Sequence, residues 1–238
     1  MTTLYLVRHG ETDNNKQACF NGSKTNQPLN ERGRAQAACL SVPFAKIAPD
    51  AIFSSPLSRA VGTAEGLRGE LPVPVVAVEA LREMDMGVFD GVSFREARAR
   101  DPQLMASWNS ADVQMPGGEC FSHVQARVHA AVARIVAEHR GKTLALVAHG
   151  TLLQLFLMRL WQIPWQDKQR LPILHNAGYA CLQIADDGYV TLLSYDELGH
   201  LSSLLAAGGS LEPRREEPKP SLGYDMIGKT VFCPDFAQ

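Results

Sequence analysis

Short apolar runs that favour β-strands alternate along this chain with longer segments of helical periodicity. Parallel strands must be joined by crossover connections such as helices, so the alternation predicts an α/β fold. Near the end of the chain, the dipeptide Asp187-Gly188 separates two further runs and predicts a hairpin with an antiparallel edge. We therefore expect a three-layer sandwich in which helices flank a mostly parallel, mixed sheet. The strand-like runs are Leu4–Val7, Ala51–Phe53, Val73–Val78, Thr143–Val147, Tyr179–Ile184 and Tyr189–Ser194.

Local signals mark the ends of several expected helices. Asn30 is expected to cap a helix over residues 31–46, and Ser55, which precedes a proline, is expected to cap a second helix. From Phe121 onward, apolar residues recur on one helical face, which predicts a long amphipathic helix. Gly141 follows this segment and is expected to end the helix.

The composition of the chain changes near residue 203. We expect residues 1–202 to form one domain and residues 203–238 to form a tail. Residues 212–221, EPRREEPKPS, are charged and rich in proline, which predicts an extended linker. The apolar segment after the linker has three options: a lid over the domain, docking on a remote face, or binding of a partner.

Composition excludes several classes of protein. The apolar fraction of 45% and the charged fraction of 20% are close to globular averages. The net charge of −2 argues against a binder of nucleic acid or of a membrane surface. No apolar run approaches the ~20 residues that span a bilayer, and the first residues do not resemble a signal peptide. The five cysteines are scattered without a C-x-x-C pair, so we expect reduced thiols in a cytoplasmic protein.

Two of the expected strands end in the same way. One runs into Arg8-His9-Gly10 and the other into Ala148-His149-Gly150. Ligands of open α/β sheets bind beyond the carboxyl ends of the strands, so two neighbouring strands would present both histidines to one ligand. A single histidine at a strand end is more often structural, whereas the repeated pattern favours a functional site. The rival interpretation is a metal site with two histidines and a carboxylate, but the fixed charge of Arg8 favours an anion.

Two further residues fit an anion site. Arg59 lies in the first turns of the helix expected after Ser55, where the helix N-terminus also favours negative charge. Glu83 follows the third strand in a segment with few charges. The alternatives without a function are that Arg59 forms a surface ion pair and that Glu83 lies in an exposed loop.

The ordered motifs of this chain resemble those of the histidine phosphatase superfamily, whose fold is like that of phosphoglycerate mutase. The resemblance covers roughly residues 3–195 and starts with the hallmark LVRHGET. It implies a mixed, mostly parallel sheet flanked by helices, in agreement with the pattern of strands and helices. The other matching segments are Phe20-Asn21-Gly22, PLNERGRAQA, FSSPLSRAVGTAE, LREMDMGVFDG, PGGECF and LVAHGTLL.

The resemblance implies a catalytic role for five residues. His9 matches the nucleophile that becomes phosphohistidine, and Glu83 matches the proton donor. Arg8, Arg59 and His149 match the groups that hold the phosphoryl oxygens, with no metal or other cofactor. We expect the two arginines to lower the pKa of His9, and burial beside a phosphate to raise the pKa of Glu83.

The resemblance also implies contacts to the substrate. Asn15 and Gly150 match supporting contacts to the phosphate, and Asn21 and Gly22 match a loop that touches the substrate. The segment of residues 84–118 is expected to form a cap over the pocket, and its apolar residues would suit an apolar part of the substrate. Packing of an added helix pair is the alternative.

The implied function is that of a phosphomonoesterase of broad specificity toward small phosphorylated metabolites. The alternatives are a phosphoglycerate mutase that depends on its phosphorylated cofactor, a dedicated α-ribazole phosphate phosphatase, and a scaffold without activity. Only 65 residues separate Glu83 from His149, whereas mutases of this family carry a longer insertion there. Matches at all five catalytic positions argue against the scaffold. The sequence leaves the oligomeric state open, with a homodimer as one option.

Overall fold

The sheet of this protein has seven strands in the order β3-β2-β4-β1-β5-β6-β7. The computed structural model describes residues 1–206 and 226–237. Strands β1 to β4 are parallel, and β5, β6 and β7 each run antiparallel to the strand before them in the sheet. The expected mixed, mostly parallel sheet is thus confirmed. The strands are β1 Thr2–Arg8, β2 Ala51–Ser54, β3 Val75–Ala77, β4 Thr143–Ala148, β5 Tyr179–Ile184, β6 Asp187–Glu197 and β7 Thr230–Ala237.

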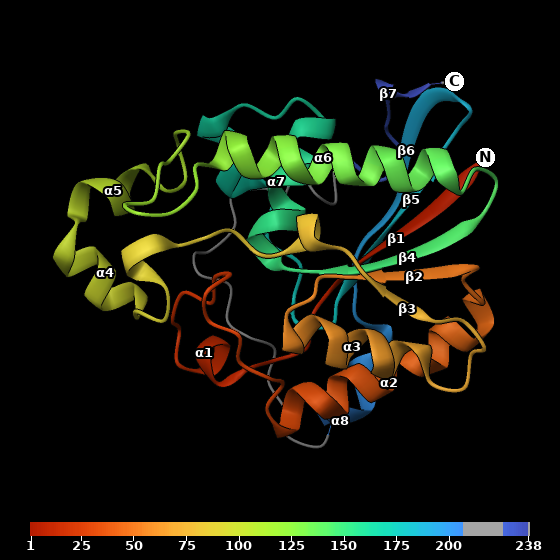
Figure 1. Cartoon of the computed structure of the whole chain (residues 1–238), viewed down its shortest axis with the longest axis horizontal. Coiled ribbons are helices and arrows are strands. Elements are labelled where there is room, and N and C mark those ends of the chain that lie inside the picture. Colours follow the sequence, from red (N-terminus) through yellow and green to blue (C-terminus); the bar gives the residue numbers. More distant parts are fainter. Residues whose placement is uncertain (207–225, 238) are drawn as a thin grey trace.

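Helices cover both faces of the sheet, which gives the expected three layers (Figure 1). Helices α6 and α7 pack on one face, and α2 and α3 pack on the other. The α-helices are α1 Asp13–Lys16, α2 Glu31–Ile47, α3 Ser58–Arg68, α4 Phe94–Arg100, α5 Pro102–Ser107, α6 Phe121–Glu138, α7 Gly150–Leu160 and α8 Ser202–Ala206. Short 3₁₀ helices are η1 Glu79–Leu81, η2 Gly87–Phe89, η3 Trp165–Arg170 and η4 Gly199–Leu201.

The period of two along each strand divides the core between the two faces. Leu4 and Leu6 of β1 face α6 and α7, while Val7 faces α2 and α3. Helix α6 buries the apolar face expected of it, including Val124 and Val128. All five cysteines are free.

Two expected helix ends are wrong. Helix α3 begins at Ser58 with Leu57 at its N-cap and no side-chain cap, while the hydroxyl of Ser55 accepts from the N–H of Leu57 and binds His149. Helix α6 ends at Glu138, with His139 as its C-cap. Gly141 lies beyond it, with a φ of +75°, in the turn that leads into β4. The Asn30 cap of α2 is confirmed, since its side chain accepts a hydrogen bond from the N–H of Gly33.

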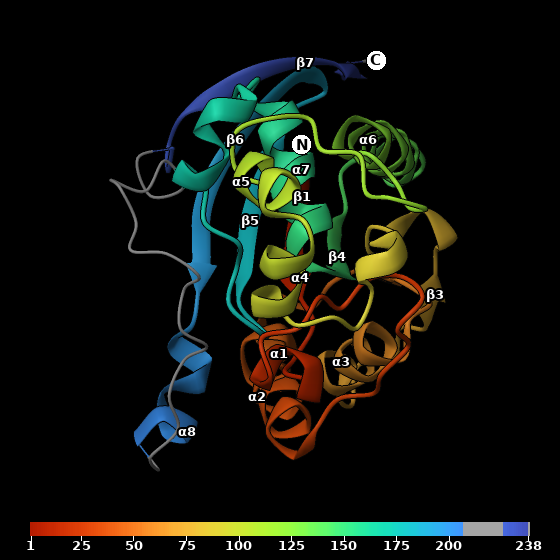
Figure 2. The same cartoon turned by 90° about the vertical axis from the view of Figure 1, so that its left-hand side faces the viewer.

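The segment of α4 and α5 lies over the carboxyl end of the sheet. Figure 1 shows α4 and α5 together at one side of the molecule, and in the view of Figure 2 α4 lies between α1 and α7. The ring of Phe94 in α4 packs edge-on against Phe20, with centroids 4.6 Å apart. Lys168 of η3 donates to the backbone oxygen of Trp108 at 3.0 Å, and its ammonium group lies over the indole ring of the same residue. These contacts join the end of the α4–α5 segment to η3.

Strand β7 forms an edge of the sheet. Thr2 at the start of β1 pairs with Ile184, and Ile184 pairs with Val190 of β6. Val190 in turn pairs with Val231, so β7 is level with the amino end of β1. This part of the tail therefore packs far from the strand end that carries His9. The linker expected over residues 212–221 lies outside the described residues.

Candidate active site

The two histidines of the repeated motif lie side by side. Strands β1 and β4 are neighbours, and their register pairs Arg8 with Ala148, so His9 and His149 leave the sheet at the same level. Their ring centroids are 5.2 Å apart, and both side chains are buried. The motif thus places two imidazoles at one point beyond the carboxyl ends of parallel strands.

Hydrogen bonds fix the orientation of His9. Its Nδ1 lies 2.7 Å from the backbone oxygen of Gly10. A carbonyl oxygen can only accept, so Nδ1 carries the ring proton and Nε2 keeps a lone pair. The side-chain amide of Asn176 donates to the backbone oxygen of His9 at 3.0 Å, which further holds the loop. His9 is therefore a neutral imidazole with Nε2 ready to attack.

Burial and positive charge lower the pKa of His9 well below its usual value. Burial is the largest cause, followed by the charges of Arg59 and Arg8. The expected direction is confirmed, although burial outweighs the arginines. The ring is neutral at pH 7, which a nucleophile requires.

Ser55 sets the tautomer of His149. Its hydroxyl oxygen accepts a hydrogen bond from the N–H of Leu57 and lies 2.7 Å from His149 Nε2. His149 Nε2 is the one acceptor that the hydroxyl proton has among the described residues, so we assign that proton to this bond and the ring proton to Nδ1. His149 Nδ1 is buried and has no partner among the described residues. Burial and Arg59 lower the pKa of His149 as well, so it is a neutral donor.

Arg59 is fully buried at the start of α3. Its two terminal nitrogens donate to the backbone oxygens of Thr25, Asn21 and Gly22 at 2.8–3.1 Å. Burial lowers the pKa of its guanidinium to about 10, so it remains charged near neutrality. Its Nε has no partner in the described part of the chain. Arg59 therefore holds the loop of residues 21–25 in place and adds a fixed positive charge to the site.

Arg8 and Gly150 lie in contact at the start of α7. Arg8 is buried, and its Nη1 donates to the backbone oxygen of Leu174 at 2.7 Å. A Cβ at Gly150 would lie 2.6 Å from Ile173 and 3.2 Å from Arg8 Nε. A side chain at position 150 would force Ile173 to shift and would crowd the guanidinium of Arg8. This explains why the second motif needs its glycine.

Glu83 is buried at the N-terminus of α7. Its Oε1 accepts from the N–H groups of Met84 and Leu152, and its Oε2 accepts from Thr151 at 3.1 Å. Burial raises the pKa of Glu83, while these bonds and Arg59 oppose the shift. A carboxyl group with a raised pKa beside two histidines suits a proton donor.

Side chains from other segments bind the loop of residues 21–25. The side-chain oxygen of Asn15 closes a capping box with Thr12, and the amide of Asn21 donates to the hydroxyl of Thr12 at 2.9 Å. Asp90 accepts from the N–H of Gly22 at 2.8 Å. A Cβ at Gly22 would lie 2.7 Å from Asp90 Oδ2, so the close approach needs glycine.

Several residues of the site could not be read from the motifs. Asn176, which holds the His9 backbone, also lies 3.4 Å from the side-chain oxygen of Asn15. Its neighbour His175 is bound to Asp196, with Nδ1 2.6 Å from Oδ2. The only signal was a polar His-Asn pair directly before the strand Tyr179–Ile184.

Arg127 of α6 supports Glu83 from behind. It donates to the backbone oxygens of Ala80, Arg82 and Glu83 at 2.8–3.3 Å. Glu119 binds the same guanidinium at 2.8–2.9 Å, and this pairing lowers the pKa of Glu119. Glu119 belongs to the PGGECF motif, so its presence there was the one available signal.

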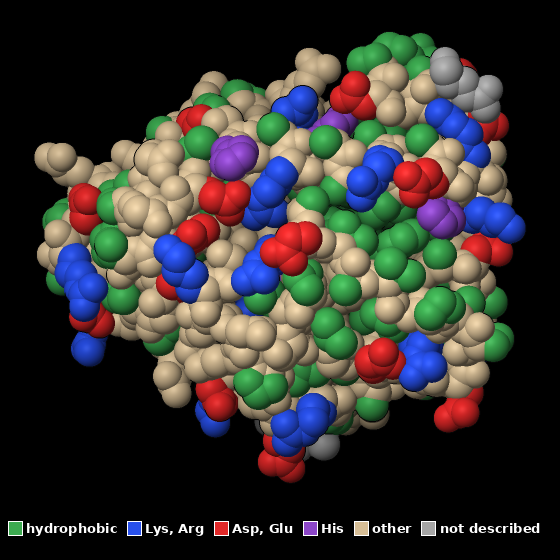
Figure 3. Space-filling view, in the orientation of Figure 1, with side chains coloured by type: hydrophobic (Ala, Val, Ile, Leu, Met, Phe, Trp, Pro, Cys, Tyr) green, Lys and Arg blue, Asp and Glu red, His purple; other side chains and the backbone are tan. Residues whose placement is uncertain are grey.

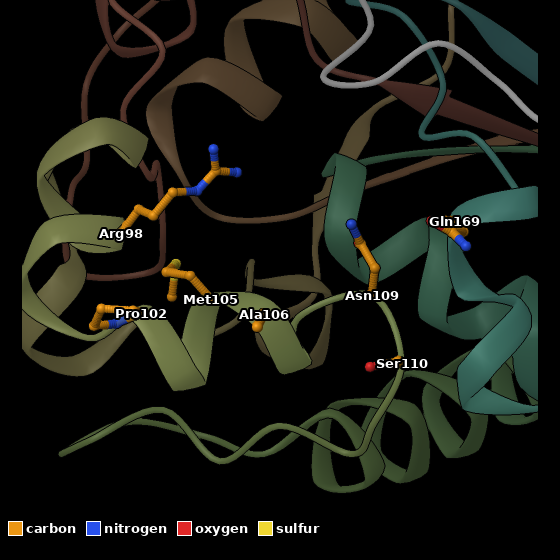
Figure 4. A pocket seen from close by; sticks show the side chains of 7 residues that line it. All are labelled: Arg98, Pro102, Met105, Ala106, Asn109, Ser110 and Gln169. Carbon is orange, nitrogen blue, oxygen red and sulfur yellow. The ribbon is translucent and has the colours of Figure 1, made fainter.

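A separate pocket of about 440 Å³ is lined by residues of α4, α5, the loop after α5, and η3. The guanidinium of Arg98 extends from α4 into this pocket, and Gln169 approaches from η3 (Figure 4). None of the nine site residues expected from the sequence lines this pocket. Its lining comprises Arg98, Pro102, Met105, Ala106, Asn109, Ser110 and Gln169.

The fold and the arrangement of His9, Arg59, Glu83 and His149 define a phosphoryl-transfer type of site on a mixed α/β sheet. The model of the histidine phosphatase superfamily (branch 1) matches residues 4–197. The chain therefore belongs to this superfamily.

Comparisons with individual proteins agree with the family. A bifunctional protein of Mycobacterium tuberculosis is 37% identical over 160 residues, which are 66% of this chain and 43% of that protein. The chain thus spans less than half the length of this relative. A metal-independent phosphoserine phosphatase of Arabidopsis thaliana is 30% identical over 209 residues, which are 86% of this chain and 85% of that one. Other relatives are named as phosphoserine phosphatases or as probable phosphoglycerate mutases.

A solved structure shows the same fold. The mycobacterial glucosyl-3-phosphoglycerate phosphatase, solved with VO3, superposes with a TM-score of 0.75 and 28% identity. The match covers 82% of this chain and 99% of that one. Over the residues that the family model matches, which end before β7, the fold is that of the superfamily.

Proposed function

We propose that this protein is a phosphomonoesterase that passes the phosphoryl group of a small metabolite to His9 and then to water. The observation that carries the proposal is the state of His9. Its ring is buried and neutral, with Nδ1–H bound to Gly10 and Nε2 free to attack beside two fixed arginines. The phosphatase names among the relatives support the same reaction.

In the first step, the lone pair of His9 Nε2 attacks phosphorus while the bond to the leaving oxygen breaks. Arg8, Arg59 and His149 Nδ1 donate to the phosphoryl oxygens, where charge spreads in the transition state. Glu83 gives its proton to the leaving oxygen, which departs as an alcohol. The positive charge that forms on the His9 ring is stabilised by the Nδ1–H bond to Gly10.

In the second step, the carboxylate of Glu83 takes a proton from water, whose oxygen attacks phosphorus. The phosphorus–nitrogen bond breaks, and His9 returns to its neutral form. Inorganic phosphate leaves, and Glu83 is protonated again. The raised pKa of Glu83 suits both steps, because it accepts and returns one proton.

We assign a broad range of small phosphorylated metabolites as substrates. On the face shown in Figure 3, basic and acidic side chains are intermixed, so this face offers no continuous basic surface to a polyanion. A dedicated α-ribazole phosphate phosphatase and a cofactor-dependent phosphoglycerate mutase are the alternatives. A mutase needs basic groups for a second phosphate. On α4, Arg100 is instead paired with Glu96, whereas Arg98 lines the separate pocket.

Assays on the purified full chain separate these functions. We expect release of phosphate from p-nitrophenyl phosphate and from a panel of phosphorylated metabolites, without conversion of 3-phosphoglycerate to 2-phosphoglycerate. Addition of 2,3-bisphosphoglycerate should leave this result unchanged. His9→Ala should lower kcat at least about 10³-fold and abolish the ³¹P signal of phosphohistidine. Mutase activity that needs 2,3-bisphosphoglycerate would overturn the assignment, and His123→Ala, on an exposed side chain, is the control.

The proposal extends to the setting of the enzyme. No helix in the described part of the chain combines the length and apolar character needed to cross a membrane. We propose cytoplasmic action by a catalytic domain of residues 1–202, without a metal in the reaction. A homodimer is one option for the assembly, and light scattering of the full chain measures it.

A further inference from the structure

The edge strand β7 carries a large bulge. Tyr189 of β6 pairs with Phe232, and Asp187 pairs with Ala237, so the residues between them on β7 face a single residue of β6. A bulge bends its strand and redirects its side chains. Here it turns Cys233 and Asp235 toward α6. Both residues lie beyond the part of the chain that matches the superfamily.

His129 of α6 meets both of these side chains. Its Nδ1 lies 3.2 Å from Asp235 Oδ2, and its Nε2 lies 3.5 Å from Cys233 Sγ. One donor atom from each of the three residues lies within 4.8 Å of the other two. His129 and Cys233 are buried, whereas the Asp235 side chain is 55% exposed.

These distances fit a tetrahedral cation. Zinc binds thiolate sulfur at roughly 2.3 Å and imidazole nitrogen at roughly 2.0 Å, so a tetrahedral angle separates the two donors by about 3.5 Å. Cys233 Sγ and His129 Nε2 already have that separation. The carboxylate of Asp235 faces Nδ1, so it must turn away from that nitrogen to reach a cation held at Nε2. Its exposure to solvent leaves room for this movement and for the water that would complete the coordination.

Metal binding at this site would release a proton. Metal ligation needs a neutral imidazole and a thiolate. Burial and the charge of Arg159 lower the pKa of His129. Burial and the charge of Asp235 raise the pKa of Cys233, so the cation must displace the thiol proton.

The charge balance is met by the ligands themselves. A thiolate and a carboxylate carry two negative charges, which match those of a divalent cation. Arg159 repels the cation but favours the deprotonated forms of His129 and Cys233. Nitrogen, sulfur and oxygen donors together favour zinc over magnesium or calcium.

We propose that His129, Cys233 and Asp235 form a structural zinc site that fastens β7 to α6. The site lies at the amino end of β1, at the opposite end of the strand from His9, and takes no part in phosphoryl transfer. Its metal would join an edge strand from the tail to a core helix.

Metal titration of the untagged full chain tests this site. After treatment with a chelator, the protein should bind one equivalent of Co²⁺ and show a sulfur-to-cobalt charge-transfer band, which Zn²⁺ then displaces. Cys233→Ser should remove the band. Asp235→Asn, at an exposed side chain, should weaken zinc binding at least about tenfold without opening a cavity. Cys39→Ser is the matched control and should bind as the parent does.

Hydrogen exchange supplies a second measurement. Zinc should slow amide exchange in residues 230–237 of the parent and of Cys39→Ser, but not of Cys233→Ser. Absence of the cobalt band in the parent, or the same band in Cys233→Ser, would overturn the proposal. Phosphate release, measured after removal of unbound metal, should be equal with and without zinc, so failure of this site is distinguishable from failure of the proposed activity.

Discussion

At the scale of single residues, the hydrogen-bond partners of His9 and His149 indicate which ring nitrogen carries the proton. The carbonyl oxygen of Gly10 can only accept, so it fixes the proton on His9 Nδ1. The Ser55 hydroxyl has no acceptor other than His149 Nε2 among the described residues, so we assign its proton to that bond. Two histidines with similar positions in the motif thereby acquire different tasks, one as a nucleophile and one as a donor.

Glu83→Gln separates the proton donor from the rest of the site. Glutamine keeps the size of the side chain but has no acidic proton. With alkyl phosphates, whose leaving oxygens need that proton, kcat should fall about 10²- to 10⁴-fold. With p-nitrophenyl phosphate, formation of phosphohistidine in a burst experiment should fall by less than tenfold, because p-nitrophenolate leaves unprotonated. Equal losses in the two experiments would contradict the acid role.

Ser55→Ala tests the tautomer of His149. Without the hydroxyl, His149 Nε2 loses its partner and the ring can turn or move its proton to Nε2. We expect kcat to fall at least about tenfold, with a smaller change in KM, since the lost donor acts mainly in the transition state. Ser54→Ala is the matched control, because Ser54 is also buried but bonds the backbone oxygen of Ser55. Equal kcat in the two variants would contradict this role.

At the scale of elements, the motifs located the strand ends but not what holds them. The repeated His-Gly pattern places His9 and His149 correctly, because strand ends and glycine turns are local features. The Ser55 hydroxyl binds His149 in addition to accepting from the nearby N–H of Leu57, a tertiary contact that the local cap signal does not indicate. Asn176 and Arg127 reach the site from distant parts of the chain. Such contacts depend on packing between elements, which no local pattern encodes.

Arg127→Ala tests how α6 supports the segment before the cap. The variant would leave three backbone oxygens without their donor and Glu119 without its partner. We expect the free energy of unfolding to fall by about 2–4 kcal/mol, because the remaining polar groups are partly buried. Urea denaturation measures it. Arg134→Ala, on the exposed face of the same helix, should change stability by less than about 0.5 kcal/mol, and similar losses in both variants would contradict the role.

At the scale of the whole molecule, the near-neutral net charge conceals a local concentration of positive charge beside His9. The net charge of −2 over 238 residues gave no sign of an anion site. The structure buries Arg8 and Arg59 together at one end of the sheet, next to His9. The composition could exclude an extended polyanion, but a single phosphate requires only a few converging groups.

The buried histidines make the whole fold sensitive to acid. His9 and His149 have pKa values well below 6.5 in the folded state, while the unfolded chain binds their protons near pH 6.5. Below pH 6.5 the unfolded state therefore holds more protons, and stability falls as the pH falls. Between pH 6.5 and 5.5 each histidine should cost about 1 kcal/mol.

Glu83 acts in the opposite sense as the pH rises above 4.5. Its pKa is raised by folding, so the unfolded state loses that proton first and stability falls as the pH rises above 4.5. Glu83→Gln removes this opposing contribution. Urea denaturation at pH 6.5 and 4.5 should therefore show a larger loss of stability on acidification in Glu83→Gln than in the parent chain. A His9→Asn variant should show a smaller loss, and equal losses in all three proteins would contradict the assignment of these two buried groups.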